Sequence, residues 1–500
     1  MPSFSLTLGS LTVYAALAFF LWYTTSAVYA WWRLRRVPGP FLASFSYLWV
    51  AWHIVRGTVD VGHKSLQKYG PLARTGPGYV VTHDPEVIRR IMAARGSYGK
   101  HAWWGGARSH PTEDSILSTV DMARHDEIKA QTANGYNGRD GTDVHGRVDR
   151  QVERLVGLVR RRFVSAAGAR RVVDLTDLMR FFTLDVTTDL SYGRPFGFLD
   201  KGKDLFDFNR TMDAYVSAMT LGLDVPFFRN LMRSPLMAFL LPKDTDNSGA
   251  GKIMGIAQDI VRDRFENDKR DEKDMLGSFM RHGLTQTQCE AETFVQIAAG
   301  SDTTGSLLST TMLYIITTPR VYQRLKEEIR AAVAADSVSY PIALEQAKKL
   351  PYLQAVISEG FRMRPPVPYG AFMAVPPRGD TIHGVYLPGG TGVGFNIVAM
   401  MRCAETFGVD VDVFRPERFL ECDDDARRGM LRQVDMAFGT GRLLCAGKQV
   451  ALLELNKVFF ELMRAFDFQL VDPRKGWRER ALVVSTQNDM WVTITEDLLR

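Results

Sequence analysis

The stretch FGTGRLLCAGKQVALLELNKVFFELMRAFDF, residues 438–468, joins a glycine-rich loop to an apolar helical pattern and places one cysteine, Cys445, at the junction. Free backbone N–H groups and the positive end of the helix dipole lower the pKa of a thiol at such a position. Gly439, Gly441 and Gly447 allow left-handed backbone and leave room for a flat ligand. The stretch predicts a metal-binding or nucleophilic cysteine, and a buried structural cysteine is the plain alternative.

Composition narrows the class of protein. The 500 residues hold four scattered cysteines, with no C-x-x-C pair and no His/Cys cluster at zinc spacing, which argues against disulfides and favours a reducing compartment. With 46% hydrophobic residues the chain can bury a large core. The net charge of +6 comes without a block of lysine and arginine among aromatics, so we expect no nucleic-acid binding.

The N-terminus predicts a membrane anchor. Residues 1–32 carry no charged side chain, and the apolar run is longer than the ~20 residues that span a bilayer. Trp31 and Trp32 suit the interface, and the arginines that follow place the rest of the chain in the cytosol. A cleaved signal peptide is the alternative, but the segment lacks a basic start and is long for one. We expect an anchor at 1–32, a basic, proline-containing hinge at 33–45 and one large domain at 46–500.

The remaining pattern predicts a mainly α fold with small β-sheets. Residues 70–92 indicate a short hairpin followed by a helix that opens at Pro85. Further strand signals lie at 379–396, in ALVVS (481–485) and in MWVTITE (490–496). Most other segments have a helical period.

The loop around Cys445 resembles the heme-binding loop of the cytochrome P-450 family, F-x-x-G-x-R-x-C-x-G, with Phe438, Gly441, Cys445 and Gly447 in place. The resemblance implies the cytochrome P-450 fold and a heme b whose iron takes an axial thiolate from Cys445. Where the family usually has arginine this chain has Leu443, and Arg442 lies one residue earlier. The shift is similar to a fungal, pisatin-demethylase-like branch. In the family this arginine binds a heme propionate. In this chain either Arg442 reaches that propionate or the contact is missing.

Two further motifs agree with the resemblance. SEGFRMRPP (358–366) places Glu359 and Arg362 three apart on one helical face, which alone is usually a surface ion pair. It also matches the family's Glu-x-x-Arg, and FRPERF (414–419) matches P-E-R-F. The resemblance implies that Arg418 joins Glu359 and Arg362 in a buried network that fixes the geometry of the heme-side core.

Residues 291–319 form a long apolar helical pattern interrupted by Gly300, Ser301, Asp302, Thr303 and Thr304, which favour a helix interior poorly. A kinked core helix is the plain explanation. The segment is similar to the family's A-G-x-(D/E)-T-T. That likeness implies that Thr303 holds the hydrogen bonds around bound dioxygen, while Asp302 feeds protons from solvent.

Cationic partners for the heme propionates are less clearly marked. DMARHDEIKAQ (121–131) places His125 and Lys129 four apart on a predicted helix, where the family has Trp or His followed by Arg. The resemblance implies that His125, Lys129 and Arg442 contact the propionates, and a surface helix is the alternative. Another arginine that the family often supplies is replaced here by Met373.

Three stretches are expected over the distal face of the heme: 97–111 with Trp103 and Trp104, a lid at 214–242 rich in Met, Phe and Leu, and 365–373. Each can be core packing by itself. Together they predict a lipophilic substrate of moderate size.

The resemblance implies a membrane-anchored monooxygenase of the endoplasmic reticulum, single-pass, with its catalytic domain in the cytosol. It would use O2 and electrons from NADPH through an NADPH-cytochrome reductase, with cytochrome b5 as a second candidate donor, in secondary metabolite biosynthesis. One alternative is a heme-thiolate isomerase or dehydratase, against which the Asp302–Thr303 pair argues. A second alternative is a non-catalytic membrane heme protein. A third is a cysteine hydrolase, against which the lack of a histidine matched to Cys445 argues.

Overall fold

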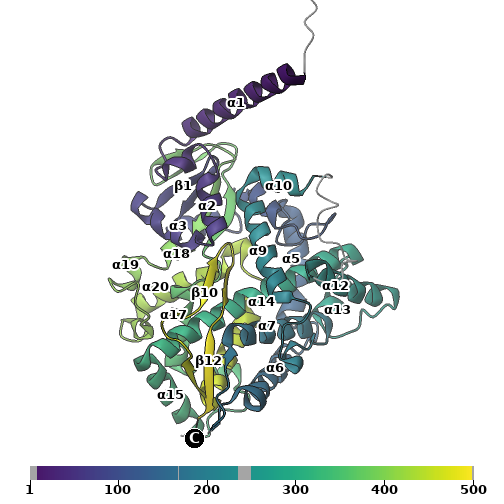
Figure 1. Cartoon of the computed structure of the whole chain (residues 1–500), viewed down its shortest axis with the longest axis vertical. Coiled ribbons are helices and arrows are strands. Elements are labelled where there is room, and N and C mark those ends of the chain that lie inside the picture. Colours follow the sequence, from purple (N-terminus) through teal and green to yellow (C-terminus); the bar gives the residue numbers. More distant parts are fainter. Residues whose placement is uncertain (1–7, 167, 235–248, 498–500) are drawn as a thin grey trace, which may run out of the picture.

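The computed structural model of the chain describes residues 8–166, 168–234 and 249–497. Helices dominate it and the strands form small sheets, so the predicted fold class is confirmed (Figure 1). The α-helices of these residues are α1 (Leu8–Arg33), α2 (Leu48–Arg56), α3 (Val59–Ser65), α4 (Pro85–Ile91), α5 (Met122–Asn137), α6 (Val144–Leu158), α7 (Leu175–Tyr192), α8 (Phe198–Lys201), α9 (Phe208–Asp224), α10 (Pro226–Met232), α12 (Gly249–Glu266), α13 (Met275–Arg281), α14 (Gln286–Thr317), α15 (Pro319–Ala334), α16 (Leu344–Ala347), α17 (Pro351–Met363), α18 (Ile397–Met400), α19 (Ala404–Phe407), α20 (Asp424–Asp435) and α21 (Lys448–Ala465).

The largest sheet has the strand order β1-β2-β8-β5-β3. Its strands are β1 (Leu72–Gly76), β2 (Tyr79–Thr82), β3 (Gly99–Lys100), β5 (Tyr369–Ala374) and β8 (Gly392–Asn396). The smaller sheets pair β4 (Val173–Asp174), β12 (Trp491–Glu496) and β9 (Phe466–Leu470), then β10 (Arg478–Ala481) with β11 (Ser485–Asn488), and β6 (Asp380–Ile382) with β7 (Val385–Leu387).

The predicted hairpin and helix near the N-terminus are confirmed. Strands β1 and β2 pair antiparallel, and α4 begins at Pro85. Asp84 caps this helix by accepting hydrogen bonds from the backbone N–H groups of Glu86 and Val87. Proline at the first helical position and an aspartate before it are the usual start of a helix, because both suit the unpaired N–H groups there.

The prediction of a strand over ALVVS holds only for its ends, Ala481 in β10 and Ser485 in β11, and is wrong for the residues between them. Residues 482–484 form the turn between β10 and β11. Leu482 and Val483 are buried in the core beside α9, where the Val483 N–H approaches the Thr220 hydroxyl at 3.4 Å. The apolar run therefore marks a buried turn, which alternation of side chains cannot distinguish from a short strand.

Helix α1 projects from one end of the body (Figure 1). It is apolar and long enough to span a membrane from Leu11 to Arg33, and none of that window is buried. Residues 1–7 of the expected anchor lie outside the described residues. The guanidinium of Arg74 in β1 donates to the carbonyl of Ala30 at 2.7 Å. The backbone N–H of Arg74 donates to the carbonyl of Pro38 at 2.8 Å. These bonds tie the end of α1 and the VPGP segment to the large sheet.

Candidate functional site

Cys445 lies in the loop that leads into α21, three residues before the helix begins at Lys448. Its sulfur accepts hydrogen bonds from the backbone N–H groups of Gly447 and Lys448, and its own N–H donates to the Phe438 carbonyl at 2.8 Å. Burial raises the pKa of the Cys445 thiol, against smaller lowering effects from those N–H groups and from Lys129 and Lys448. The lowering by the backbone N–H groups is as expected, but desolvation outweighs it in the thiol.

Cys445 nevertheless has accessible surface. Accessible surface combined with loss of hydration is what we expect of a group that faces an internal hollow. Gly441, with φ +58°, packs so tightly on Met92 that a Cβ would overlap the Met92 carbonyl oxygen. The loop glycines therefore give the loop its shape, as expected, and hold it against the body.

A second accessible surface lies in the middle of α14. Residues 291–297 of this helix are buried, whereas Ala299 is exposed and Thr303, one turn later, is half-buried. The next residue, Thr304, hydrogen bonds to the buried Glu454 of α21, the helix that follows the Cys445 loop. Because α14 and α21 are joined there, we assign the accessible faces of Ala299, Thr303 and Cys445 to one hollow. Small side chains on one wall and a sulfur on the other fit a flat heme.

Asp302 faces Arg180 of α7. It is buried, and neither carboxylate oxygen has a hydrogen-bond partner. The Nε of Arg180 lies 3.8 Å from its Oδ1, and burial raises the pKa of Asp302 to about 6. Arg180 in turn pairs with Asp213 at 3.2 Å, whose side chain is 24% exposed. Asp302 is thus one end of a charged chain that leads toward the surface.

The predicted Glu359 network is present. Arg362 binds both carboxylate oxygens of Glu359, at 2.7 and 2.8 Å, and the Nε of Arg418 lies 3.1 Å from each oxygen. The N–H of Arg415 adds a further hydrogen bond at 2.8 Å. Glu359 and Arg362 have no exposed surface, so the set is structural rather than part of the hollow.

His125, Lys129 and Arg442 come together, with Asp126 among them. Arg442 forms an ion pair with Asp126, and the Nδ1 of His125 lies 3.1 Å from the same carboxylate. The ammonium of Lys129 donates to the Arg442 carbonyl at 2.6 Å. Burial lowers the pKa of His125, which favours the neutral ring. The three predicted propionate contacts thus lie beside the Cys445 loop.

The sequence reasoning missed Asp126, Arg180 and Glu454. Asp126 stands between two residues already singled out, so its spacing was a usable signal. Arg180 and Glu454 had none, because they meet α14 from other helices and their charges are explained only by those contacts.

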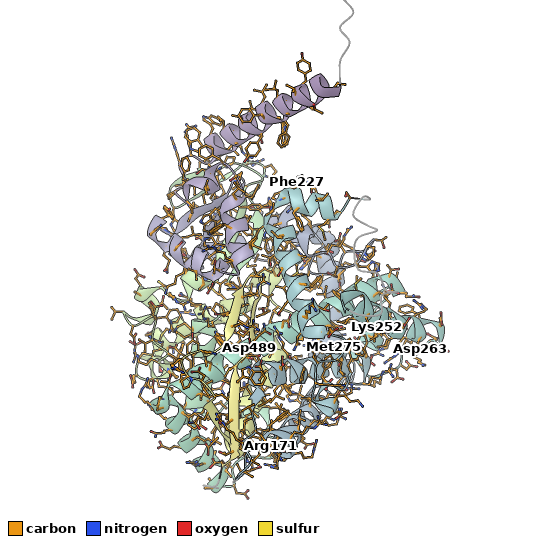
Figure 2. The ribbon with its side chains drawn as sticks, in the orientation of Figure 1. Arg171, Phe227, Lys252, Asp263, Met275 and Asp489 are labelled. Carbon is orange, nitrogen blue, oxygen red and sulfur yellow. The ribbon has the colours of Figure 1, made fainter. Side chains whose placement is uncertain are left out.

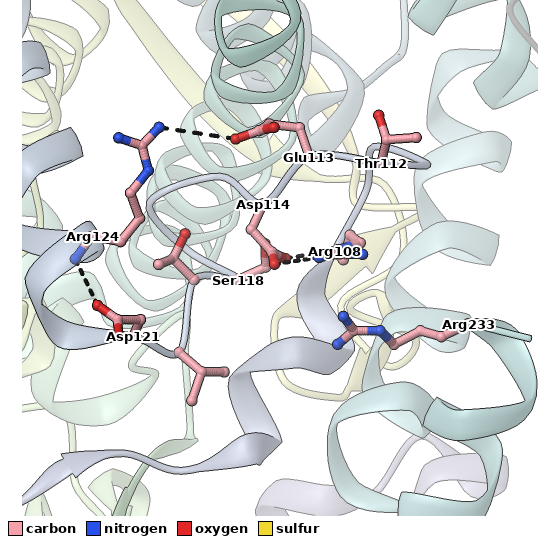
Figure 3. A pocket seen from close by; sticks show the side chains of 10 residues that line it. Arg108, Thr112, Glu113, Asp114, Ser118, Asp121, Arg124 and Arg233 are labelled. Carbon is pink, nitrogen blue, oxygen red and sulfur yellow. Dashed lines mark hydrogen bonds and ion pairs between the residues drawn. The ribbon is translucent and has the colours of Figure 1, made fainter.

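The stretches expected over the distal face also meet. Trp103 lies in the 3-10 helix η3 (Ala102–Ala107), and α9 and α10 cover the described part of the predicted lid, whose residues 235–242 lie outside the described residues. A pocket of about 380 Å³ opens between the loop after η3 and the end of α10 (Figure 3). This pocket is separate from the hollow at Cys445. The charged residues that line it are Arg108, Glu113, Asp114, Asp121, Arg124 and Arg233.

Comparisons with known proteins agree with this arrangement. The family described as Cytochrome P450 matches residues 38–491. "Cytochrome P450 monooxygenase ABA1" of Pyricularia oryzae is 41% identical over 95% of this chain and 95% of the relative. "Cytochrome P450 monooxygenase aba1" of Botryotinia fuckeliana is 42% identical over 93% and 92%. "Cytochrome P450 monooxygenase mpaDE'" of Penicillium brevicompactum is 28% identical over 93% of this chain and 56% of the relative. These matches confirm the resemblance found in the sequence.

Proposed function

The chain belongs to the cytochrome P450 family and is a monooxygenase, and from this premise we propose that Cys445 provides the thiolate that binds the heme iron. The observation that carries the proposal is the accessible Cys445 side chain at the start of α21, together with the accessible stretch of α14 at residues 298–300 and Thr303, which interrupts the buried part of that helix. A bound heme supplies the cleavage of dioxygen and the insertion of one oxygen atom into a lipophilic substrate.

Two backbone N–H groups prepare Cys445 for this role. Metal ligation requires a thiolate, and the N–H groups of Gly447 and Lys448 favour that charged form. Burial raises the thiol pKa, so the charge is stable only when a cation offsets the loss of hydration. The loop therefore suits a sulfur bound to iron better than a free nucleophile.

Thr303 and Asp302 are proposed to handle protons. The Thr303 hydroxyl donates to the Ala299 carbonyl at 2.8 Å, so its oxygen is left to accept a hydrogen bond from a group in the hollow. Asp302, held by Arg180 only at 3.8 Å, can turn between that guanidinium and the hollow. With a pKa of about 6 it can both take up and release a proton near neutral pH.

We propose that Arg442, Lys129 and His125 contact the heme propionates. Arg442 is the strongest candidate, because its partner Asp126 has a side chain that is 46% exposed and the ion pair is open to exchange. Lys129 holds the loop through the Arg442 carbonyl and adds positive charge beside it. The Glu359, Arg362 and Arg418 network has a separate role, because its arginines bind backbone carbonyls of residues 401–413 and fix that segment.

Membrane attachment is proposed from three apolar features at one end of the molecule. Helix α1 is apolar and unburied, and Trp52 of α2 and Phe227 of α10 are 57% and 76% exposed. Figure 2 shows Phe227 at the end from which α1 projects. We place the protein in the endoplasmic reticulum membrane with the body in the cytosol, where an NADPH-cytochrome reductase, or cytochrome b5, supplies electrons. The fungal relatives support a role in secondary metabolite biosynthesis.

The test is the carbon monoxide difference spectrum of the reduced protein. Wild-type protein and Cys422→Ala, a matched cysteine variant outside the site, are expected to show the thiolate-type band. Cys445→Ala is expected to lose it while keeping the wild-type circular dichroism spectrum. A band that survives Cys445→Ala would overturn the assignment.

A further inference from the structure

A buried carboxylate joins the three stretches predicted to cover the distal face. Asp224, the last residue of α9, is 2% exposed. The indole N–H of Trp103 in η3 donates to its Oδ1 at 2.7 Å, and the hydroxyl of Tyr369 in β5 donates to its Oδ2. Both donors are themselves buried. One side chain of the lid thus holds the loop on one side and the sheet on the other.

The backbones of the lid and the loop also touch beside this carboxylate. A Cβ on Gly106 of η3 would overlap the backbone of Gly222 in α9, and a Cβ on Gly222 would lie 3.1 Å from the Gly106 carbonyl oxygen. Only glycine at Gly106 permits the approach, because any side chain would push the two segments apart. The contact at Asp224 is therefore made possible by a fitted pair of glycines.

A carboxylate is a costly way to join apolar elements. Burial raises the pKa of Asp224 to about 6, although the hydrogen bonds from Trp103 and Tyr369 oppose this. An apolar residue at this position would avoid the loss of hydration, as buried charged groups rarely stabilise a fold more than apolar packing does. A hydrogen-bonded joint differs in being directional, and its partners can separate into water.

The same seam contains the pocket near Arg233. Figure 3 shows Arg233, at the end of α10, facing Arg108 and Asp114 from the loop after η3. One wall of the pocket thus belongs to the lid, and the other belongs to the loop. The Asp224 contacts and this pocket therefore lie where the same two segments meet.

We propose that Asp224 is a positioning residue that, with Trp103 and Tyr369, latches the α9–α10 lid to η3 and β5 and so controls entry of substrate into the hollow at Cys445. The inference rests on the proposed function, since the hollow is taken to hold the heme. We call these three residues the Asp224 latch.

The experiment uses the full-length, heme-loaded protein and two iron ligands of different size, 4-phenylimidazole and carbon monoxide, with association followed by stopped-flow absorbance. In Asp224→Asn one acceptor oxygen is replaced by an amide donor that faces a second donor. Loss of one hydrogen bond to a charged group is expected to raise the association rate of 4-phenylimidazole about tenfold. The rate for carbon monoxide, which needs little opening, should stay unchanged.

Trp103→Phe and Tyr369→Phe remove single donors while keeping the carboxylate and the rings. Each is expected to give a smaller increase, and Tyr369→Phe should add nothing in the Asp224→Asn background, since both act on one joint. If Asp224→Asn does not load heme, these two variants carry the test. Asp185→Asn is the matched control, because Asp185 is also a buried carboxylate but binds the N–H groups of residues 197–199 instead.

Three outcomes would overturn the latch: 4-phenylimidazole rates equal to wild type in every variant, an equal increase in Asp185→Asn, or an additive effect of Tyr369→Phe on Asp224→Asn. Failure of the proposed function would instead show in the wild-type protein, as loss of the thiolate-type carbon monoxide band. The two failures are therefore distinguishable.

Discussion

Glu359 and Asp302 are both buried carboxylates on helices that flank the site, yet their surroundings are opposite. Glu359 accepts hydrogen bonds from Arg362, Arg418 and the Arg415 backbone. Among the described residues, Asp302 has no hydrogen bond to either oxygen, and its ion-pair partner Arg180 is 3.8 Å away. A saturated carboxylate holds its neighbours in one arrangement, whereas an unsatisfied one is a strained group that can change partner or protonation state. Glu359 therefore belongs to the structural framework of the site, and Asp302 is the candidate for its proton chemistry.

The largest effect is expected when the saturated carboxylate is changed. Glu359→Gln removes the charge that balances two fully buried guanidinium groups and should lower the free energy of unfolding by about 3–5 kcal/mol. Urea denaturation of the heme-loaded protein measures it. Glu345→Gln, which alters an exposed ion pair with Lys348, is the control and should be neutral. Equal free energies of unfolding of Glu359→Gln and Glu345→Gln would contradict a structural role for Glu359.

Asp302→Asn should have the opposite sign. The pKa of Asp302 rises from 3.8 to about 6 on folding, because burial disfavours its charge. The unfolded chain therefore loses its proton first, and the wild-type free energy of unfolding falls as pH rises from about 4 to about 6. Asn cannot titrate, so the variant should be more stable at pH 7, by up to about 3 kcal/mol. Denaturation of both proteins across this pH range checks it.

The same variant should lose function. If Asp302 delivers protons, the rate of product formation should fall roughly 10²-fold in Asp302→Asn, the usual contribution of a positioned proton donor to a rate. Loss of stability relative to wild type at pH 7, or an unchanged rate of product formation, would place Asp302 with Glu359 in the framework.

The smallest effect is expected at the exposed edge of the site. Asp126→Asn breaks the ion pair with Arg442, which is half-exposed and worth about 0–1 kcal/mol. It also frees Arg442 for a propionate, so heme transfer to excess apomyoglobin should be no faster than in wild type, while Arg442→Gln should speed it. Faster heme loss in both variants would mean that the pair itself, rather than the arginine, retains the heme.

Local sequence was enough for several parts of the fold. Pro85 after Asp84, the glycines around Cys445 and the Glu359–Arg362 spacing act within one turn or one loop, so the pattern itself carries the information. Residues 482–484 were misjudged, since an apolar run looks the same in a strand and in a buried turn. The net direction of the Cys445 pKa shift did not follow from the local pattern, because burial by distant segments outweighs the neighbouring N–H groups.

By itself, the order of residues determined the long helix α14, the Cys445 loop and the membership in the cytochrome P450 family. Only the tertiary structure decided which buried charges are satisfied. Glu359 meets Arg418, and Asp302 meets Arg180, from segments far away in the chain, and Asp224 meets Trp103 across 121 residues. Hydration, hydrogen bonding and close backbone approach depend on which atoms are adjacent in space, and no local pattern specifies that.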